Sequence, residues 1–85
     1  MLKLSSYPNV FNTCLVLVER QGYSIGYEKA RGEWQAKKGV YVLIADNPIE
    51  LLGLAAVVSE SPPDATHDYW WRVEEPNLLA KLNPE

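Results

Sequence analysis

The chain has few of the residues that form enzyme active sites, disulfides and metal sites. Its 85 residues include one histidine, His67, and one cysteine, Cys14. A single cysteine forms no intramolecular disulfide, and a zinc site takes several ligands that usually come from more than one element. The few glycines are scattered, so no glycine-rich phosphate loop is present. We therefore expect no metal, no cofactor and no catalytic residue of a familiar type.

Basic residues are also scarce. Eight Lys and Arg residues are outnumbered by eleven Asp and Glu residues, which gives a net charge of −3. Sequence-independent affinity for nucleic acid grows with the number of cationic contacts, and basic faces also bind membrane surfaces. We expect neither general nucleic-acid binding nor membrane binding.

Long hydrophobic runs are absent too. No run approaches the roughly 18 apolar residues of a membrane span, and Met1 to Ser5 lacks the apolar core of a signal peptide. These features predict a cytoplasmic protein. The length suits one domain, whose stability margin is thin because a small domain buries a smaller fraction of its surface.

Residues 9–21 predict a helix. Pro8 suits a first helical turn and Gly22 suits the position just past the end. One face of this helix gathers the apolar residues Val10, Phe11, Cys14, Leu15, Leu17 and Val18. Cys14 is then a small buried hydrophobe. A strand over residues 14–18 is the alternative, because that run is apolar and partly β-branched.

Three strands are expected next, at residues 23–28, 33–37 and 40–45. The first two alternate apolar and polar residues, as half-buried strands do. The third is continuously apolar, which predicts a central strand covered on both faces. Short turns between the strands predict an antiparallel meander.

Residues 48–59 predict a second helix. Asn47 is a suitable cap, Pro48 fits the first helical position, and Glu50 is spaced to reach back to the cap. Apolar residues surround this helix, which predicts burial on more than one side. Gly53 lowers helix stability, and close approach of another backbone is the expected compensation.

Adjacent prolines at positions 62 and 63 predict a linker over residues 59–64. It separates a compact body, 1–61, from a tail, 62–85, that packs on the body within one domain. The tail is expected to be extended or a short helical turn at 69–73, and then a short helix from Pro76. That helix is expected to turn three leucines inward: Leu78, Leu79 and Leu82. The fold class is α+β: helix, three-stranded antiparallel meander, buried helix, and C-terminal tail with a short helix.

Two sets of polar residues resemble reactive sites only superficially. Asp64, His67 and Asp68 are of metal-ligand type, but they lie beside the prolines, and we interpret them as a solvated loop. The acids Glu28, Glu33, Glu50, Glu74 and Glu75 have no spacing that indicates an acid–base pair. A solvated surface and a helix cap account for them.

Aromatic residues are numerous for a chain of this size. The candidates for contact with a partner are Trp34, Tyr69, Trp70 and Trp71. Tryptophan and tyrosine are favoured at protein interfaces, although they also fill the cores of small domains. Trp70 and Trp71 are adjacent, so burial of one favours exposure of the other if they lie in a strand.

Two segments carry a resemblance. Residues 45–54 read ADNPIELLGL, and Trp70-Trp71 is followed by Glu75-Pro76-Asn77-Leu78. Together they resemble a pattern in small uncharacterised bacterial proteins, which implies a bacterial cytosolic origin and no particular activity.

We expect a non-catalytic protein-interaction module, either a homodimer or a protein that binds a partner, through the second helix or the Trp70-Trp71 tail. Residues 40–45 and that helix together carry more apolar surface than so small a body hides, and contiguous apolar patches mark interaction sites. Small acidic immunity, antitoxin-like or regulatory proteins act in this way. The alternative is a small-ligand binder or an enzyme that uses an aromatic-lined pocket.

Overall fold

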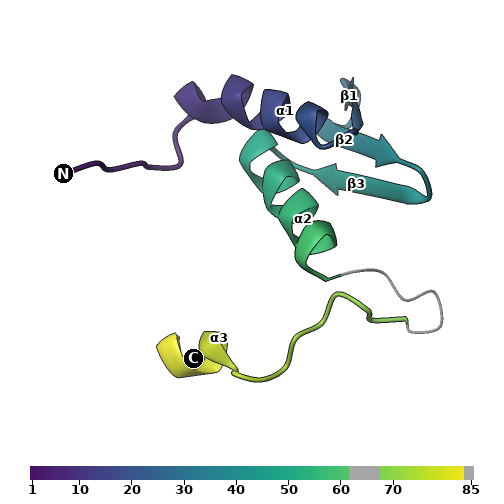
Figure 1. Ribbon diagram of the computed structural model, residues 1–85. Helices are drawn as coiled ribbons and strands as arrows, with labels where there is room; N and C mark the ends of the chain where they lie inside the picture. The colour runs from purple at the N-terminus through teal and green to yellow at the C-terminus, as the bar shows by residue number, and fades with distance from the viewer. Residues whose placement is uncertain (62–67, 84–85) are drawn as a thin grey trace.

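The computed structural model describes residues 1–61 and 68–83, and it confirms the predicted α+β fold (Figure 1). A three-stranded antiparallel sheet packs against two helices, and a short helix lies near the C-terminus. The elements are η1 Pro8–Val10, α1 Phe11–Arg20, β1 Ser24–Glu28, β2 Glu33–Lys38, β3 Tyr41–Ala45, α2 Pro48–Glu60 and α3 Leu78–Leu82.

The first segment is a helix, as predicted, and the strand alternative is wrong. The 3-10 turn η1 begins at Pro8 and leads directly into α1. Gly22 follows the end of α1 with φ +97°, a conformation that residues with a side chain rarely adopt. Cys14 and Val18 are buried in the body, whereas Leu17 is more exposed than the predicted apolar face implies.

The sheet has the strand order β1-β2-β3. Its inner face brings Ile25, Ala36 and Leu43 into register across the three strands. Ala36 and Leu43 join Val18 of α1 and Leu51 and Ala55 of α2 in one core. Both helices therefore lie on the same face of the sheet (Figure 1).

The opposite face of the sheet carries the alternate residues of each strand. Its members are Ser24, Gly26, Glu28, Glu33, Gln35, Lys37, Val42 and Ile44. Most of them are polar or small, which suits a face in contact with water. The two apolar members, Val42 and Ile44, both belong to β3.

β3 is an edge strand, so the prediction of a central strand covered on both faces is wrong. In a meander the middle strand of the chain is the middle strand of the sheet, and that strand is β2. Val42 and Ile44 remain 56% and 51% exposed. β3 is at the edge because it is the last strand of the meander. Its apolar composition, by contrast, is typical of a strand that is covered on all sides.

The start of α2 confirms the predicted cap. The side chain of Asn47 accepts a hydrogen bond from the backbone N–H of Glu50 at 2.9 Å. The carboxylate of Glu50 accepts from the N–H of Asp46 at 3.3 Å, one residue before the cap and not from Asn47 itself. Pro48, at the first helical position, is fully buried.

The rest of α2 departs from prediction in two ways. Its core side holds Leu51 and Ala55, but Leu54 and Val57 stay partly exposed, so the helix is buried on one side only. Gly53 meets no other backbone, since a Cβ built there would have no neighbouring atom within 4 Å. The expected close approach is therefore absent from the described part of the chain.

The tail forms a turn at residues 69–72, where the N–H of Arg72 donates to the carbonyl of Tyr69. α3 begins at Leu78, and Asn77 caps it by accepting from the N–H of Ala80 at 3.0 Å. Its leucines (78, 79 and 82) are exposed, so the predicted inward packing is wrong. A helix of little more than one turn, set away from the body, has no core to reach (Figure 1).

The predicted linker falls partly in α2, which continues to Glu60. Its residues 62–64 lie outside the described residues. The division into a body and a tail at residue 61 stays a prediction.

Candidate functional site

A groove lined only by apolar side chains runs between β3, α2 and the tail. Its volume is about 260 Å³. We call it the β3 groove and define it by its lining residues, which are Val42, Leu43, Ile44, Leu54, Val57, Val58, Trp70 and Trp71. No charged side chain lines it among residues 1–61 and 68–83.

β3 contributes three consecutive residues to this groove. Successive side chains of a strand point to opposite faces, so Val42 and Ile44 lie on one face and Leu43 on the other. All three line a single groove only where it follows the free edge of the strand. Within the described chain, the backbone ladder of β3 pairs it with β2 alone.

α2 contributes its outward stripe to the groove. Leu54, Val57 and Val58 are spaced three and four residues apart, so they are neighbours on the helix surface. The core stripe with Leu51 and Ala55 lies on another side of the same helix. The apolar side of α2 that does not pack in the core therefore forms a wall of the groove.

The tail closes one part of the groove with its two tryptophans. Trp70 is half-buried and its ring centroid lies 6.2 Å from that of Tyr41. Trp71 is 45% exposed and meets Trp70 edge-on, with centroids 5.7 Å apart. Tyr69 packs against Trp71 at 5.6 Å and carries the guanidinium of Arg72 over its ring at 4.5 Å.

The aromatic candidates divide into two groups. Tyr69, Trp70 and Trp71 form one cluster, and the two tryptophans line the groove. Trp34 lies elsewhere, on the inner face of β2, where its ring is 4.7 Å from that of Tyr27. Trp34 is thus an aromatic residue packed against the core.

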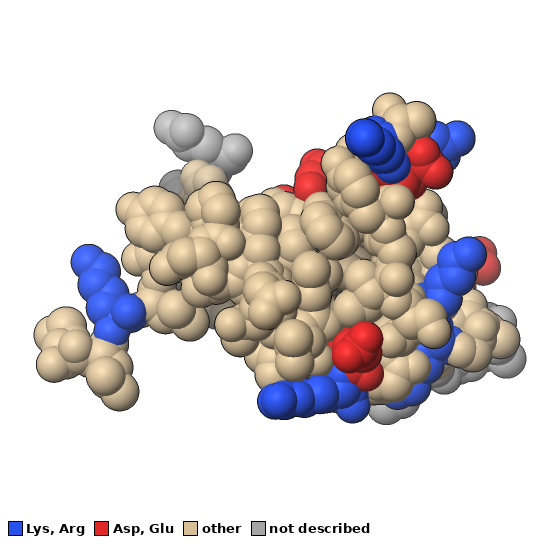
Figure 2. Space-filling model, turned by 90° about the horizontal axis from the view of Figure 1, so that it is seen from above, with Lys and Arg blue, Asp and Glu red and all other residues tan. Residues whose placement is uncertain are grey.

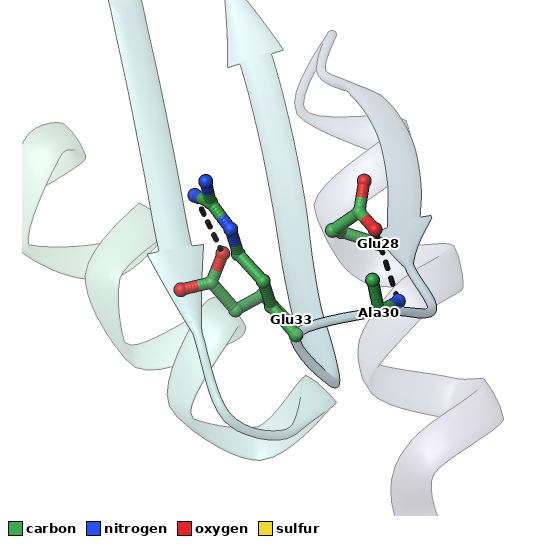
Figure 3. A network of polar contacts seen from close by, with 4 residues as sticks. Glu28, Ala30 and Glu33 are labelled. Atoms are coloured by element: carbon green, nitrogen blue, oxygen red, sulfur yellow. Dashed lines mark hydrogen bonds and ion pairs between the residues drawn. The ribbon is translucent and has the colours of Figure 1, made fainter.

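The candidate carboxylates have structural contacts. Glu28 and Glu33 face each other across β1 and β2, next to the connecting turn (Figure 3). The carboxylate of Glu28 accepts from the N–H of Ala30 at 3.0 Å, and Glu33 lies 3.9 Å from the guanidinium of Arg31. Glu50 belongs to the helix cap, as described, and Glu74 and Glu75 are exposed in the tail.

Of the three residues of metal-ligand type, the structure describes only one. Asp64 and His67 lie outside the described residues, and Asp68 is exposed. Among the residues that are described, no three His, Cys, Asp or Glu side chains gather as metal ligands.

A second pocket, of about 370 Å³, has a mixed lining. Its residues are Gln21, Tyr23, Lys38, Tyr41, Ala55, Val58 and Ser59. The ammonium of Lys38 lies 5.4 Å from the centre of the Tyr23 ring. Burial, and secondarily the neighbouring Tyr41, raises the pKa of the Tyr23 hydroxyl above its ordinary value.

Charge is dispersed on the face that Figure 2 shows. Lys and Arg side chains lie mostly toward the margins and close to acidic groups, while uncharged residues cover most of the middle (Figure 2). This face therefore offers no concentrated basic patch for phosphates. In the described part of the chain, no helix combines the length and the apolar character that crossing a bilayer requires.

The sequence pointed to the second helix and to the Trp70-Trp71 tail as contact surfaces, but it did not predict that they meet β3 in one groove. Val42 and Ile44 were expected to be covered within a central strand, and Leu54 and Val57 were expected to be buried on a second side. The signal was present in the sequence: two elements are apolar all round in a chain with too few elements to cover both.

No protein-family model, no curated protein and no solved structure matches the chain.

Proposed function

We propose that the protein is an interaction module that binds another polypeptide through the β3 groove. The observation that carries this proposal is that β3 and α2 each have an apolar side that the core does not bury. The unburied sides of β3 and of α2 meet in the same groove. Apolar surface exposed in one contiguous patch characteristically marks an interaction site in a soluble protein.

The chemistry of the groove favours a polypeptide over a small ligand. Small-molecule sites combine apolar walls with a few placed polar groups that fix the orientation of the ligand. The described lining of the β3 groove has no charged side chain. Its features match the apolar centre of an interface, with aromatic residues and a cation, Arg72, next to them.

A partner-binding role of the immunity, antitoxin-like or regulatory kind accords with a small acidic chain. In that role the groove would cover part of a partner protein and restrain its activity. The bacterial cytosolic origin implied by the resemblance belongs to the same proposal.

The test uses two leucines that match in residue type, helical setting and exposure. Leu54 and Leu17 are each 37% exposed, but only Leu54 lines the groove. A lysine at position 54 should abolish binding, because it places a charge in an apolar contact. Leu17→Lys on α1 should bind as the wild type does.

Binding is measured with purified components. Proteins captured from a lysate by the wild type are identified by mass spectrometry, purified, and titrated with the three chains by calorimetry. Self-association is measured on the same three chains. A partner whose affinity falls equally with Leu54→Lys and Leu17→Lys would contradict the assignment of the groove.

The rival function, small-ligand binding, would use the second pocket. Lys38, Tyr23 and Tyr41 place a cation and two phenol groups around one opening, a combination suited to an anionic aromatic compound. Lys38→Met should abolish binding of such a compound while leaving partner binding through the groove intact.

A further inference from the structure

We infer that the β3 groove is occupied by a second copy of this chain, with β3 of one copy pairing antiparallel to β3 of the other. The two sheets then form one continuous six-stranded sheet about a twofold axis. This inference rests on the proposed function of the groove and specifies the partner.

Among the described residues, β3 pairs with β2 alone, so its other edge has no strand partner. An edge strand presents unpaired backbone N–H and C=O groups, which are a template for strand addition. Proteins usually protect such edges with charges, proline or bulges. β3 reads Tyr-Val-Leu-Ile-Ala and contains neither a charge nor proline, and its pairing with β2 is uninterrupted.

Twofold symmetry fixes how two copies of this strand meet. With the axis perpendicular to the sheet and midway between the two strands, Leu43 lies opposite its own counterpart. Val42 then lies opposite Ile44 of the second copy on the outer face, and Tyr41 lies opposite Ala45 on the inner face. Aliphatic residues directly opposite one another stabilise antiparallel pairs. Both pairs of helices stay on one side of the enlarged sheet, so the two grooves adjoin.

The charge pattern around β3 favours the antiparallel arrangement. β3 itself is uncharged, and Asp46 follows it directly. Antiparallel pairing sets the Asp46 residues of the two copies at opposite ends of the paired strands. Parallel pairing would instead place the two carboxylates side by side, which is unfavourable.

Exposed apolar side chains surround the strand edge. Around the strand edge and the groove, the partly or fully exposed side chains are Val40, Val42, Ile44, Leu54, Val57, Tyr69 and Trp71. A stable interface buries ~800 Å² on each partner, so the contact has to include the groove as well as the strand edge. A closed symmetric dimer is also the commonest way for such a self-complementary patch to be covered.

Cysteine cross-linking tests the register directly. Two chains are prepared, Val42→Cys and Ile44→Cys; both positions are exposed in the single copy, so the fold should tolerate them. Directly opposed residues have Cα atoms roughly 4.5–5.5 Å apart, within the range that a disulfide spans. A diagonal neighbour is roughly 7–8 Å away, which is too far.

The expected result is a disulfide-linked dimer when the two chains are mixed under mild oxidation, at least tenfold more than either chain gives alone. Ile44→Cys mixed with Val73→Cys, an exposed cysteine in the tail, is the control and should give little product. The native Cys14 is buried and can remain. Circular dichroism of each variant verifies the fold.

The outcomes separate this inference from the proposed function. If the protein dimerises and Leu54→Lys prevents it, but the mixed cysteine chains do not cross-link preferentially, strand pairing is wrong and the groove is still an interface. If the wild type stays monomeric while Leu54→Lys abolishes binding of a different purified protein, the second copy is the wrong occupant. If neither dimerisation nor partner binding depends on Leu54, both proposals fail.

Discussion

At the level of single residues, two asparagines make the same bond in different surroundings. Asn47 caps α2 and Asn77 caps α3, each accepting from the backbone N–H three residues ahead. α2 carries core residues, whereas α3 contributes none. The same bond should therefore matter for global stability only at α2.

The prediction is that Asn47→Ala lowers the free energy of unfolding by about 1 kcal/mol, the usual loss for a removed cap. Asn77→Ala, the matched control, should leave it unchanged within about 0.5 kcal/mol, as for an ordinary surface substitution. Urea unfolding followed by far-ultraviolet circular dichroism measures both. Equal losses for the two variants would show that the tail folds with the body.

A substitution at Gly53 should stabilise the protein. Its position on α2 is open, since an added Cβ would have no neighbour within 4 Å. Gly53→Ala should raise the free energy of unfolding by about 1 kcal/mol, because alanine is the better helix former.

Gly39 provides the contrast. Its φ of +57° is one that glycine adopts without strain, so Gly39→Ala should destabilise the protein. The midpoint of thermal unfolding separates the two variants. A lower midpoint for Gly53→Ala would mean that α2 is packed there by a surface that the single copy does not show.

Tyr23 links stability to alkaline pH. Its pKa is raised in the folded protein, chiefly because the side chain is buried. As the pH rises above the ordinary pKa of about 10, the unfolded chain releases this proton while the folded chain retains it. Stability is therefore lost between the ordinary pKa and the raised one, and it is fully present below both.

Tyr23→Phe should make the fall in unfolding free energy above about pH 10 shallower than in the wild type. Urea unfolding from about pH 8 to about pH 11 tests this. Tyr7→Phe, at an exposed tyrosine, is the control for loss of a phenol. Parallel curves for the wild type and Tyr23→Phe would contradict the role of burial at this position.

At the level of elements, the features that depend on nearby residues were predictable. The Asn-Pro-Ile-Glu sequence gave the start of α2, and glycines at positions 32 and 39, both at positive φ, mark the turns between strands. The antiparallel meander follows from the shortness of those turns. These features need no knowledge of the rest of the molecule.

The position of each element in the whole was harder to predict. The all-apolar composition of β3 and α2 indicates burial on several sides but does not say whether the covering surface belongs to the same chain. In this fold β3 is an edge and α2 has one free side. The sequence therefore marked the two aliphatic walls as surplus apolar surface, but their meeting in one groove could not be predicted for that reason.

The tail also shows that apolar composition alone does not predict where a segment packs. Three leucines near Pro76 predicted inward packing, yet α3 lies free of the body. Leu79→Ser should consequently change the free energy of unfolding by less than about 0.5 kcal/mol. Leu51→Ala, in the core of α2, should lower it by about 2–5 kcal/mol. Chemical denaturation of both variants decides whether α3 contributes to the stability of the body.

At the level of the whole molecule, one layer of helices covers one face of a small sheet. The outer face is mostly polar, and its apolar residues, Val42 and Ile44, lie on β3 beside the β3 groove. A thin stability margin makes coverage of that edge valuable, because binding to the folded state alone stabilises it. Function and stability would then depend on the same surface.

Sedimentation velocity over a wide concentration range tests this account most directly. The monomer has a mass of 9.6 kDa. The prediction is that the wild type and Leu17→Lys convert to a species of twice that mass as concentration rises, while Ile44→Lys and Leu54→Lys remain monomeric and folded. A wild-type protein that sediments as a monomer at every concentration, with the four chains indistinguishable, would contradict the assignment of the β3 groove as an interface between two copies.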